Sequence, residues 1–224
     1  MKPKGSVLAA IQGGVFALYS RLVHRTSRLT IEGWEHVEAA LEAKRPIIFV
    51  NWHGQIHLSY CVYATHFKME DMLLVIVGDW RQGLLGYFAE YSGAESYPVD
   101  MQDNSMAGAR NLLALIKKFT PGKFSYMSPD GPDGPARVAK PGTIFVAQRT
   151  EALIVPIAHR ARHALHVPRW DRYTLPMPFT RIYSVIRPAI QASREIPSKQ
   201  LLETMTRELN LAEERVEAFA NKLT

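Results

Sequence analysis

The sequence lacks several features that define common protein classes. Cys61 is the only cysteine among 224 residues, so no disulfide can form within the chain, and we expect a cytoplasmic location. Internal repeats and low-complexity segments are absent. So are the P-loop, the Gly-x-Gly-x-x-Gly dinucleotide motif and the Gly-x-Ser-x-Gly nucleophile elbow. These absences argue against a disulfide-rich secreted domain, a repeat protein, a nucleotide-binding enzyme of those types and a serine hydrolase.

Long apolar runs are also scarce. The uncharged N-terminal stretch, residues 5–20, falls short of the roughly 20 apolar residues that a spanning helix needs, and Gln-Gly-Gly interrupts it at 12–14. Basic residues flank it on both sides, and Ala17-Leu18-Tyr19 makes a poor signal-cleavage site. We expect residues 1–25 to form an amphipathic membrane-contact helix, or alternatively a first helix packed in the core, ahead of an α/β domain over residues 26–224.

Composition and charge indicate a globular protein with an anionic partner. Apolar residues make up 47% of the chain and charged residues 21%, which is enough apolar mass for a sizeable core. The net charge is +6, and the pI is near 9.5. A phospholipid surface, a phosphate-bearing ligand or a nucleic acid would suit this charge, and a merely basic soluble protein is the alternative.

Apolar runs alternate with helical periodicity along most of the chain. Strands are expected at residues 29–31, 46–50, 72–77, 96–99, 124–127, 153–158 and 182–186. Helices are expected at residues 35–43, 55–63, 82–91, 105–119, 142–149 and 198–223, with Ser105 as an N-cap. This alternation predicts a single α/β domain with a mostly parallel central sheet flanked by helices. Residues 167–179 show no clear periodicity, and loops of that length are often functional.

His53 follows directly after the predicted strand at residues 46–50. Open α/β sheets place their chemistry at the carboxyl ends of strands, and a neutral imidazole can act as a general base. The alternative is a histidine that only hydrogen-bonds a loop carbonyl. His57 lies four residues on, but Gly54 stands where the zinc-protease motif needs Glu, so we expect no metal site and a structural His57.

A second polar loop, residues 128–135, follows the predicted strand at 124–127. Its sequence, Ser-Pro-Asp-Gly-Pro-Asp-Gly-Pro, is both sharply turned and stiff, which suits a loop that holds Asp130 in a fixed place. Arg137, Lys140 and the start of the helix at Gly142 would form a phosphate or carboxylate site, unless these charges are simply solvated. Arginines and aromatic residues mix over residues 160–187, a composition that suits nucleic acid or a membrane surface.

These motifs, in this order, resemble the lysophospholipid acyltransferase superfamily, which includes glycerol-phosphate acyltransferases. His53 matches the histidine of the family's His-x4-Asp motif, Pro129-Asp130-Gly131 its Pro-Glu-Gly loop, and Val155-Pro156 its Val-Pro strand. The chain looks most similar to a bacterial branch of unknown function. The motifs of that branch appear here as Trp52-His53-Gly54, residues 130–135, Lys140-Pro141-Gly142, and Trp170-Asp171 with the Pro-x-Pro-Phe at 176–179.

Three departures concern the site. The branch usually has Arg between the two Gly-Pro pairs, where this chain has Asp133. The Asp of His-x4-Asp would fall at Leu58, so another acid must orient His53, and we expect Asp130, with Asp79 as the second candidate. The arginine of the family's second motif is not evident, and Arg81 or Arg110 would have to replace it.

The resemblance implies an acyltransferase of phospholipid metabolism on the cytoplasmic face of a bacterial inner membrane. His53 and Asp130 would be catalytic, and the substrate-binding residues would be Trp52, Gly54, Arg81, Gly131, Pro132, Arg137 and Lys140. The co-substrate would be acyl-CoA or an acyl-carrier protein, and the acceptor a lipid hydroxyl or amine, with no metal, other cofactor or nucleic acid. The alternative is a catalytically inactive module that binds lipid or anions at a membrane surface.

Overall fold

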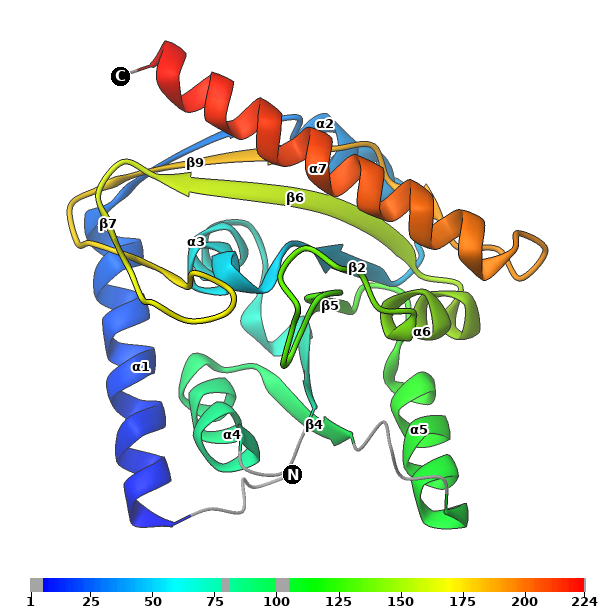
Figure 1. Ribbon diagram of the computed structural model, residues 1–224. Coiled ribbons are helices and arrows are strands. Elements are labelled where there is room, and N and C mark those ends of the chain that lie inside the picture. The colour runs from blue at the N-terminus through cyan, green and yellow to red at the C-terminus, as the bar shows by residue number, and fades with distance from the viewer. Residues whose placement is uncertain (1–5, 78–80, 100–104, 224) are drawn as a thin grey trace.

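The buried apolar runs of the sequence form neighbouring strands of one sheet. A computed structural model describes residues 6–77, 81–99 and 105–223, and its eight-stranded sheet has the order β1-β9-β6-β2-β5-β3-β4, with β10 beside β6 (Figure 1). The strands are β1 (Arg28–Glu32), β2 (Ile47–Val50), β3 (Met72–Val77), β4 (Glu95–Val99), β5 (Phe124–Met127), β6 (Leu153–Ala161), β9 (Arg181–Ile186) and β10 (Ile190–Gln191).

The centre of the sheet is parallel, as predicted. β4, β3, β5, β2 and β6 run in one direction, whereas β9 pairs antiparallel with β6 and carries β1 parallel to itself. Every side chain of β2 is buried, which matches the unbroken apolar run of a strand covered on both faces. The structure therefore confirms an α/β domain with a mostly parallel sheet.

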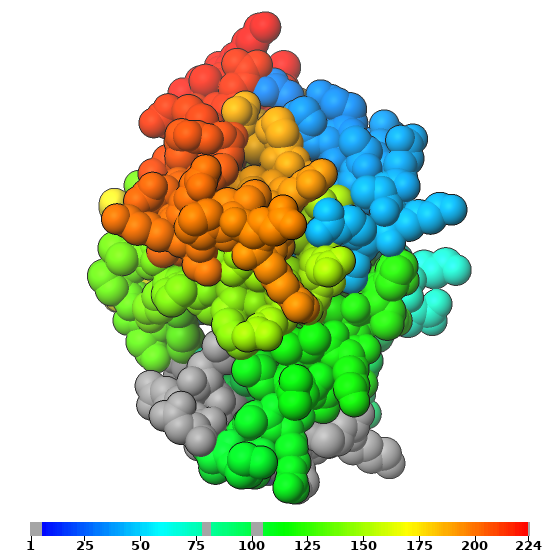
Figure 2. All heavy atoms as spheres, turned by 90° about the vertical axis from the view of Figure 1, so that its right-hand side faces the viewer, coloured from blue at the N-terminus to red at the C-terminus, as the bar shows by residue number. Residues whose placement is uncertain are grey.

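Helices cover both faces of this sheet. They are α1 (Val7–Thr26), α2 (Glu35–Glu42), α3 (Ile56–His66), α4 (Arg81–Ser92), α5 (Met106–Lys118), α6 (Gly142–Thr150) and α7 (Ser198–Lys222), with short 3₁₀ turns η1 (His53–Gln55) and η2 (Met69–Asp71). α5, α6 and α7 share one apolar core, and α2 and α3 share the core of the opposite face. Figure 2 looks at the first of these sides, where α7 in orange lies above α5 in green.

Periodicity explains why the long helices lie where they do. The buried residues of α7 are spaced by three or four, which places them on a single stripe against β6 and β9: Leu201, Met205, Leu209, Ala212, Val216 and Ala220. Ser105 caps α5 as predicted, because its hydroxyl accepts hydrogen bonds from the backbone N–H groups of Ala107 and Gly108.

The N-terminal apolar helix is longer than the uncharged stretch suggests. α1 runs through Thr26, and its 20 residues are long and apolar enough, by length and composition, to cross a membrane. One side packs against α4, where Gly13 allows backbone contact: a Cβ at this position would lie 2.8 Å from the carbonyl oxygen of Leu84. The opposite side leaves large apolar side chains exposed, namely Val7, Leu8, Ile11, Val15, Leu18 and Leu22.

Candidate active site

The two polar loops singled out in the sequence begin side by side. β2 and β5 are parallel neighbours in which Val50 is opposite Met127, so the segments that follow them leave the same edge of the sheet. The backbone N–H of His53 donates to Asp130 Oδ1 at 2.9 Å, and the backbone N–H of Arg137 donates to Asp130 Oδ2 at 3.0 Å. Asp130 is buried, so its carboxylate ties the loop of His53 to its own loop.

The imidazole of His53 is held by a different acid. Its Nδ1 lies 2.6 Å from Oδ2 of Asp171, whose side chain is fully buried. Asp171 lies between the two strands of a small hairpin, β7 (Ala164–His166) and β8 (Thr174–Pro176), within the segment that lacked periodicity. The prediction that Asp130 orients the imidazole is therefore wrong. Asp130 accepts a hydrogen bond from the backbone of His53, and Asp171 contacts the ring. The second candidate, Asp79, lies outside the described residues.

This contact fixes the tautomer of His53. A carboxylate oxygen accepts hydrogen bonds, so Nδ1 is the donor in this contact, and in the neutral ring the lone pair lies on Nε2. Among the described residues, Nε2 has no hydrogen-bond partner, and the side chain is 16% exposed. Asp171 in turn has its other oxygen 3.5 Å from Nε of Arg169. The arrangement is an Asp–His pair whose basic nitrogen is free to take a proton.

Three glycines allow the loops to meet around this pair. A Cβ on Gly54 would lie 2.2 Å from the backbone oxygen of Asp171, and a Cβ on Gly131 would lie 2.8 Å from Cδ2 of His53. Gly134 faces the ring of Trp170, which itself lies 5.1 Å from the imidazole, centroid to centroid. The motif glycines are thus positions of close approach between loops.

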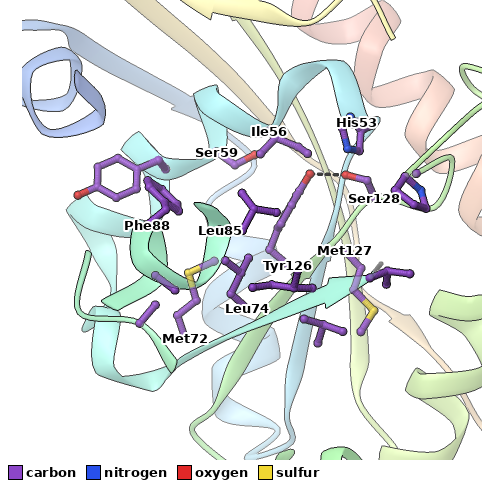
Figure 3. Close-up of a pocket in the computed structure, with 18 of the residues that line it drawn as sticks. His53, Ile56, Ser59, Met72, Leu74, Leu85, Phe88, Tyr126, Met127 and Ser128 are labelled. Atoms are coloured by element: carbon purple, nitrogen blue, oxygen red, sulfur yellow. Dashed lines mark hydrogen bonds between the residues drawn. The ribbon is translucent and has the colours of Figure 1, made fainter. Parts of the chain in front are cut away.

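A cavity of about 620 Å³ opens beside His53. Figure 3 shows His53 and Ser128 at one end of the lining, and Met72 and Phe88 toward the other. Leu74 and Tyr126 belong to the face of the sheet that carries α3, whereas Val75 and Met127 belong to the face that carries α5 and α6. Because residues from both faces line it, the cavity extends along both sides of the sheet end.

The branch of the cavity on the α3 side is mostly apolar, although Ser20, His57 and Ser59 also line it. Its wall comes from β3, α4 and the inner face of α1, through side chains such as Leu74, Ile76, Leu85, Phe88 and Phe16. This branch, which we call the apolar branch, can enclose a hydrocarbon chain whose end reaches His53.

His57 also lines the cavity, but its environment differs from that of His53. Its ring nitrogens face hydroxyl groups: Nε2 is 3.3 Å from Ser20 Oγ, and Nδ1 is 3.4 Å from the hydroxyl of Tyr173. Burial lowers the pKa of His57 to about 4, so the ring is neutral near pH 7. Within the described residues, no group of three His, Cys, Asp or Glu side chains is placed to hold a metal ion.

The structure separates the remaining predicted site residues. Gly131, Pro132 and Lys140 line the cavity. Arg137 does not: its guanidinium lies 2.9 Å from Oε2 of Glu213 on α7. Trp52 is buried in the apolar core shared by α5, α6 and α7 and is not part of the cavity lining. Arg81 begins α4, but its side chain is outside the description, and Arg110 lies in α5 and is not part of the cavity lining.

A chain of hydrogen bonds that the sequence did not predict supports the two loops from α7. Nε2 of Gln55, two residues after His53, donates to Glu213 Oε1 at 3.0 Å, and Arg137 pairs with the same carboxylate. Because Asp130 joins the backbones of His53 and Arg137, these contacts close a ring around the site. Burial, the dominant effect, raises the pKa of Glu213. In the sequence, the only signal for this role was that Glu213 lies at the buried edge of an amphipathic helix.

Comparisons with known proteins agree with this architecture. No family model matches the chain. An uncharacterized protein of Rickettsia prowazekii (strain Madrid E) is 25% identical over 171 residues, which cover 75% of each protein. A solved structure, the 1-acyl-sn-glycerophosphate (LPA) acyltransferase PlsC from Thermotoga maritima, superposes with a TM-score of 0.51 at 14% identity. The match covers 88% of this chain and 78% of that one.

The chain shares its fold with an acyltransferase. At this level of identity the likeness concerns the fold alone, and it agrees with the superfamily that the sequence motifs resemble. Leu58, which stands where that superfamily's motif has Asp, is completely buried in an apolar cluster with Val23, Cys61 and Ile182. A carboxylate at position 58 would have no place in this cluster, and Asp171 meets the imidazole instead.

Proposed function

We propose that this protein is an acyltransferase that moves a fatty acyl group from a thioester donor to a hydroxyl or amine of a lipid acceptor. One observation carries the proposal: the Asp171–His53 pair directs a free Nε2 toward a cavity with an apolar branch. A polar base beside an apolar enclosure suits a substrate with a reactive head and a long hydrocarbon tail.

The proposed reaction uses His53 as a proton carrier. Nε2 takes the proton from the acceptor hydroxyl while its oxygen attacks the thioester carbonyl carbon. The tetrahedral intermediate collapses, the C–S bond breaks, and the imidazolium returns the proton to the departing thiolate. Asp171 keeps the imidazole in position and stabilises its positive charge without itself taking a proton. The products are an ester, or an amide from an amine acceptor, and a free thiol of coenzyme A or carrier protein.

The acyl chain would lie in the apolar branch. Met72, Leu74 and Phe88 offer methyl, methylene and ring surfaces, and burial of apolar area contributes roughly 25 cal/mol per Å² to binding such a chain. Gly131 and Pro132 would shape the entrance beside the imidazole, and Lys140 would carry the positive charge there. Arg137 is committed to Glu213, so the proposal no longer gives it contact with substrate.

The exposed face of α1 would hold the enzyme on its lipid substrate. Val7 is 78% exposed, Leu18 is 67% exposed, and Phe179, on the loop beside the end of α1, is 79% exposed. A net charge of +6 favours an anionic lipid surface, and the cytoplasmic face of the inner membrane would provide one. The inner face of α1 lines the apolar branch through Phe16 and Ser20, so this placement would put the cavity next to the bilayer.

The proposal is tested by turnover of the purified protein. It is mixed with acyl-CoA or acyl-carrier protein and a panel of lysolipid acceptors, and product lipids are measured by mass spectrometry. His53→Ala should lower turnover about 10²–10⁴-fold, the usual contribution of a general base, with an unchanged melting temperature. His166→Ala, at an exposed position of β7, is the matched control. Full activity of the His53→Ala protein would refute the role of His53.

The alternative, a non-catalytic module, had two supports in the sequence: the leucine at position 58 and the altered second motif. The contact with Asp171 supplies the orienting acid that Leu58 could not, whereas the arginine of the second motif still has no identified replacement. Binding to anionic liposomes with no turnover of either donor across the acceptor panel would nevertheless favour the module over the enzyme.

A further inference from the structure

The hairpin that carries Asp171 stands apart from the main sheet. Within the described residues, its strands β7 and β8 pair only with each other, in a two-stranded sheet of their own. A hairpin of two short strands is marginally stable alone, so its position depends on the elements that hold it. The contact of Asp171 with Nδ1 of His53 depends on the same supports.

Part of this support comes from α1, beside which the hairpin lies in Figure 1. The hydroxyl of Tyr19 donates to the carbonyl oxygen of Pro176 at 2.9 Å, and the backbone N–H of Phe179 donates to Oγ1 of Thr26 at 3.1 Å. Leu22 is three residues after Tyr19 and four before Thr26, so it lies between them on the helix surface. Because Leu22 belongs to the exposed apolar stripe of α1, the hairpin borders that stripe directly.

The hairpin and the loop after it continue the apolar surface of α1. Large apolar side chains are exposed here as well, and we call them the hairpin surface: Leu165, Val167, Met177 and Phe179. Single exposed apolar side chains are common in soluble proteins, whereas a run of them that joins a second exposed stripe indicates a binding surface.

The charge around the hairpin surface indicates the partner. Residues 162–181 contain four arginines and one acidic residue, the buried Asp171. Arg162, Arg172 and Arg181 are exposed, and none of them pairs with a carboxylate of the described chain. The backbone N–H of Arg162 donates to the carbonyl oxygen of Arg181 at 2.9 Å, which brings two of these cations together near Phe179. Exposed apolar side chains among unpaired cations suit an anionic lipid interface.

Nucleic acid fits this surface less well. Binding of single strands relies on exposed aromatic rings that stack on bases. Trp170 instead lies 5.1 Å from the imidazole of His53, centroid to centroid, and the hydroxyl of Tyr173 faces Nδ1 of His57 at 3.4 Å. Apart from Phe179, the hairpin surface is aliphatic, which favours hydrocarbon over bases.

We propose that the hairpin surface and the exposed stripe of α1 form one contact surface for an anionic lipid bilayer, so that the membrane supports the element that supplies Asp171. The inference rests on the proposed function for its meaning in catalysis, because lipid contact would then steady the Asp171–His53 pair at the place where a lipid acceptor lies. The contact itself requires no turnover and can be measured without it.

Flotation of the full chain with lipid vesicles measures the contact. The vesicles contain phosphatidylcholine alone or mixed with phosphatidylglycerol. Leu165→Ser combined with Phe179→Ser should lower the partition coefficient on the mixed vesicles about 10- to 100-fold, since less apolar area is buried. Arg162→Gln combined with Arg181→Gln should lower it about 25-fold, from about 5-fold for each cation, and leave binding to phosphatidylcholine unchanged.

Two variants on the other side of the molecule are the matched controls. Met106→Ser and Lys199→Gln change exposed side chains at the starts of α5 and α7, which lie away from α1 in Figure 1, and should leave the partition nearly unchanged. A thermal melt of each variant confirms folding. Hydrogen–deuterium exchange then locates the contact, because mixed vesicles should slow exchange over residues 164–179 as well as over α1.

The outcomes separate the partners and the two proposals. Unchanged partition of both double variants, or protection confined to α1, would overturn the surface. So would protection of residues 164–179 by RNA, or by self-association at raised protein concentration, with none from vesicles. Binding that depends on the hairpin in a protein without acyl transfer would keep the surface and refute the proposed function. Acyl transfer with vesicle binding that ignores the hairpin would do the reverse.

Discussion

Asp130 and Asp171 are both buried carboxylates beside His53, yet they contact different parts of it. Asp130 accepts two backbone N–H groups and joins two loops, whereas Asp171 accepts the ring proton of the imidazole. The first contact determines where the loops lie, and the second determines which nitrogen of the histidine is basic. A carboxylate close to a candidate base is therefore not necessarily the partner of that base. The partner is identified by which donor its oxygen meets, the ring N–H or a backbone N–H.

The largest effect on activity should come from Asp171. Asp171→Asn keeps the shape of the side chain, but its amide can donate to Nδ1 and favour the wrong tautomer of His53. We expect turnover to fall about 10²–10⁴-fold, with the fold retained. Steady-state kinetics and a thermal melt measure the two quantities. An active Asp171→Asn enzyme would contradict the distinction between the carboxylates.

Asp130 should matter first for stability. Asp130→Asn leaves one carbonyl oxygen for two buried N–H donors and places an NH₂ group against the second. The free energy of unfolding should fall by about 2–4 kcal/mol, since unsatisfied buried donors cost 1–3 kcal/mol each and the lost acceptor is charged. Urea denaturation measures this change. If Asp171→Asn destabilised the protein more than Asp130→Asn, the two roles would be reversed.

Only part of this site could be predicted from the sequence. The apolar runs at β2 and β5 predicted two strands of one parallel sheet, and a site built from the loops that follow them; the structure shows that the two strands are neighbours. Asp171 was visible only as part of the Trp170-Asp171 motif in a segment without periodicity. Its approach to a residue 118 positions away depends on the path of a loop, which no repeat in the sequence encodes. The antiparallel pairing of β9 with β6 escaped prediction for the same reason, because a buried strand looks alike in either direction.

The motif glycines test the same distinction between contacts to backbone and contacts to the His53 ring, with smaller expected effects. Gly54→Ala would drive a Cβ into the rigid backbone of Asp171, whereas Gly131→Ala would press on the movable ring of His53. We expect Gly54→Ala to lower stability by roughly 1–3 kcal/mol, as overpacking does, and Gly131→Ala to reduce turnover with a smaller stability loss. Gly14→Ala, which meets only the ring edge of Tyr91, is the control. Equal stability losses for Gly54→Ala and Gly131→Ala would argue against this difference between backbone and ring.

Buried histidines that face only hydroxyl groups should respond to acid. Burial lowers the pKa of His57 to about 4 and that of His159, between Ser59 and Ser184, to about 3. In the folded protein both rings stay neutral down to low pH, whereas in the unfolded chain they protonate near pH 6.5. Their contribution to the free energy of unfolding is therefore complete above pH 6.5 and is lost as the pH falls toward 4. Each should cost about 2 kcal/mol of stability between pH 7.5 and pH 5. His57→Gln should remove the part of this pH dependence that His57 causes, and urea denaturation at several pH values measures it. An unchanged slope of the unfolding free energy against pH would contradict the lowered pKa of His57.

The most direct test of the account is the protonation of the His53 ring, observed by NMR on protein with ¹⁵N-labelled histidine. We predict a downfield proton on Nδ1 of His53 near pH 7.5. The signal should be lost in Asp171→Asn and His53→Ala and kept in Asp130→Asn as long as that protein is folded. A proton on Nε2 instead, or a signal that survives Asp171→Asn, would contradict the assignment of Asp171 as the partner of the base.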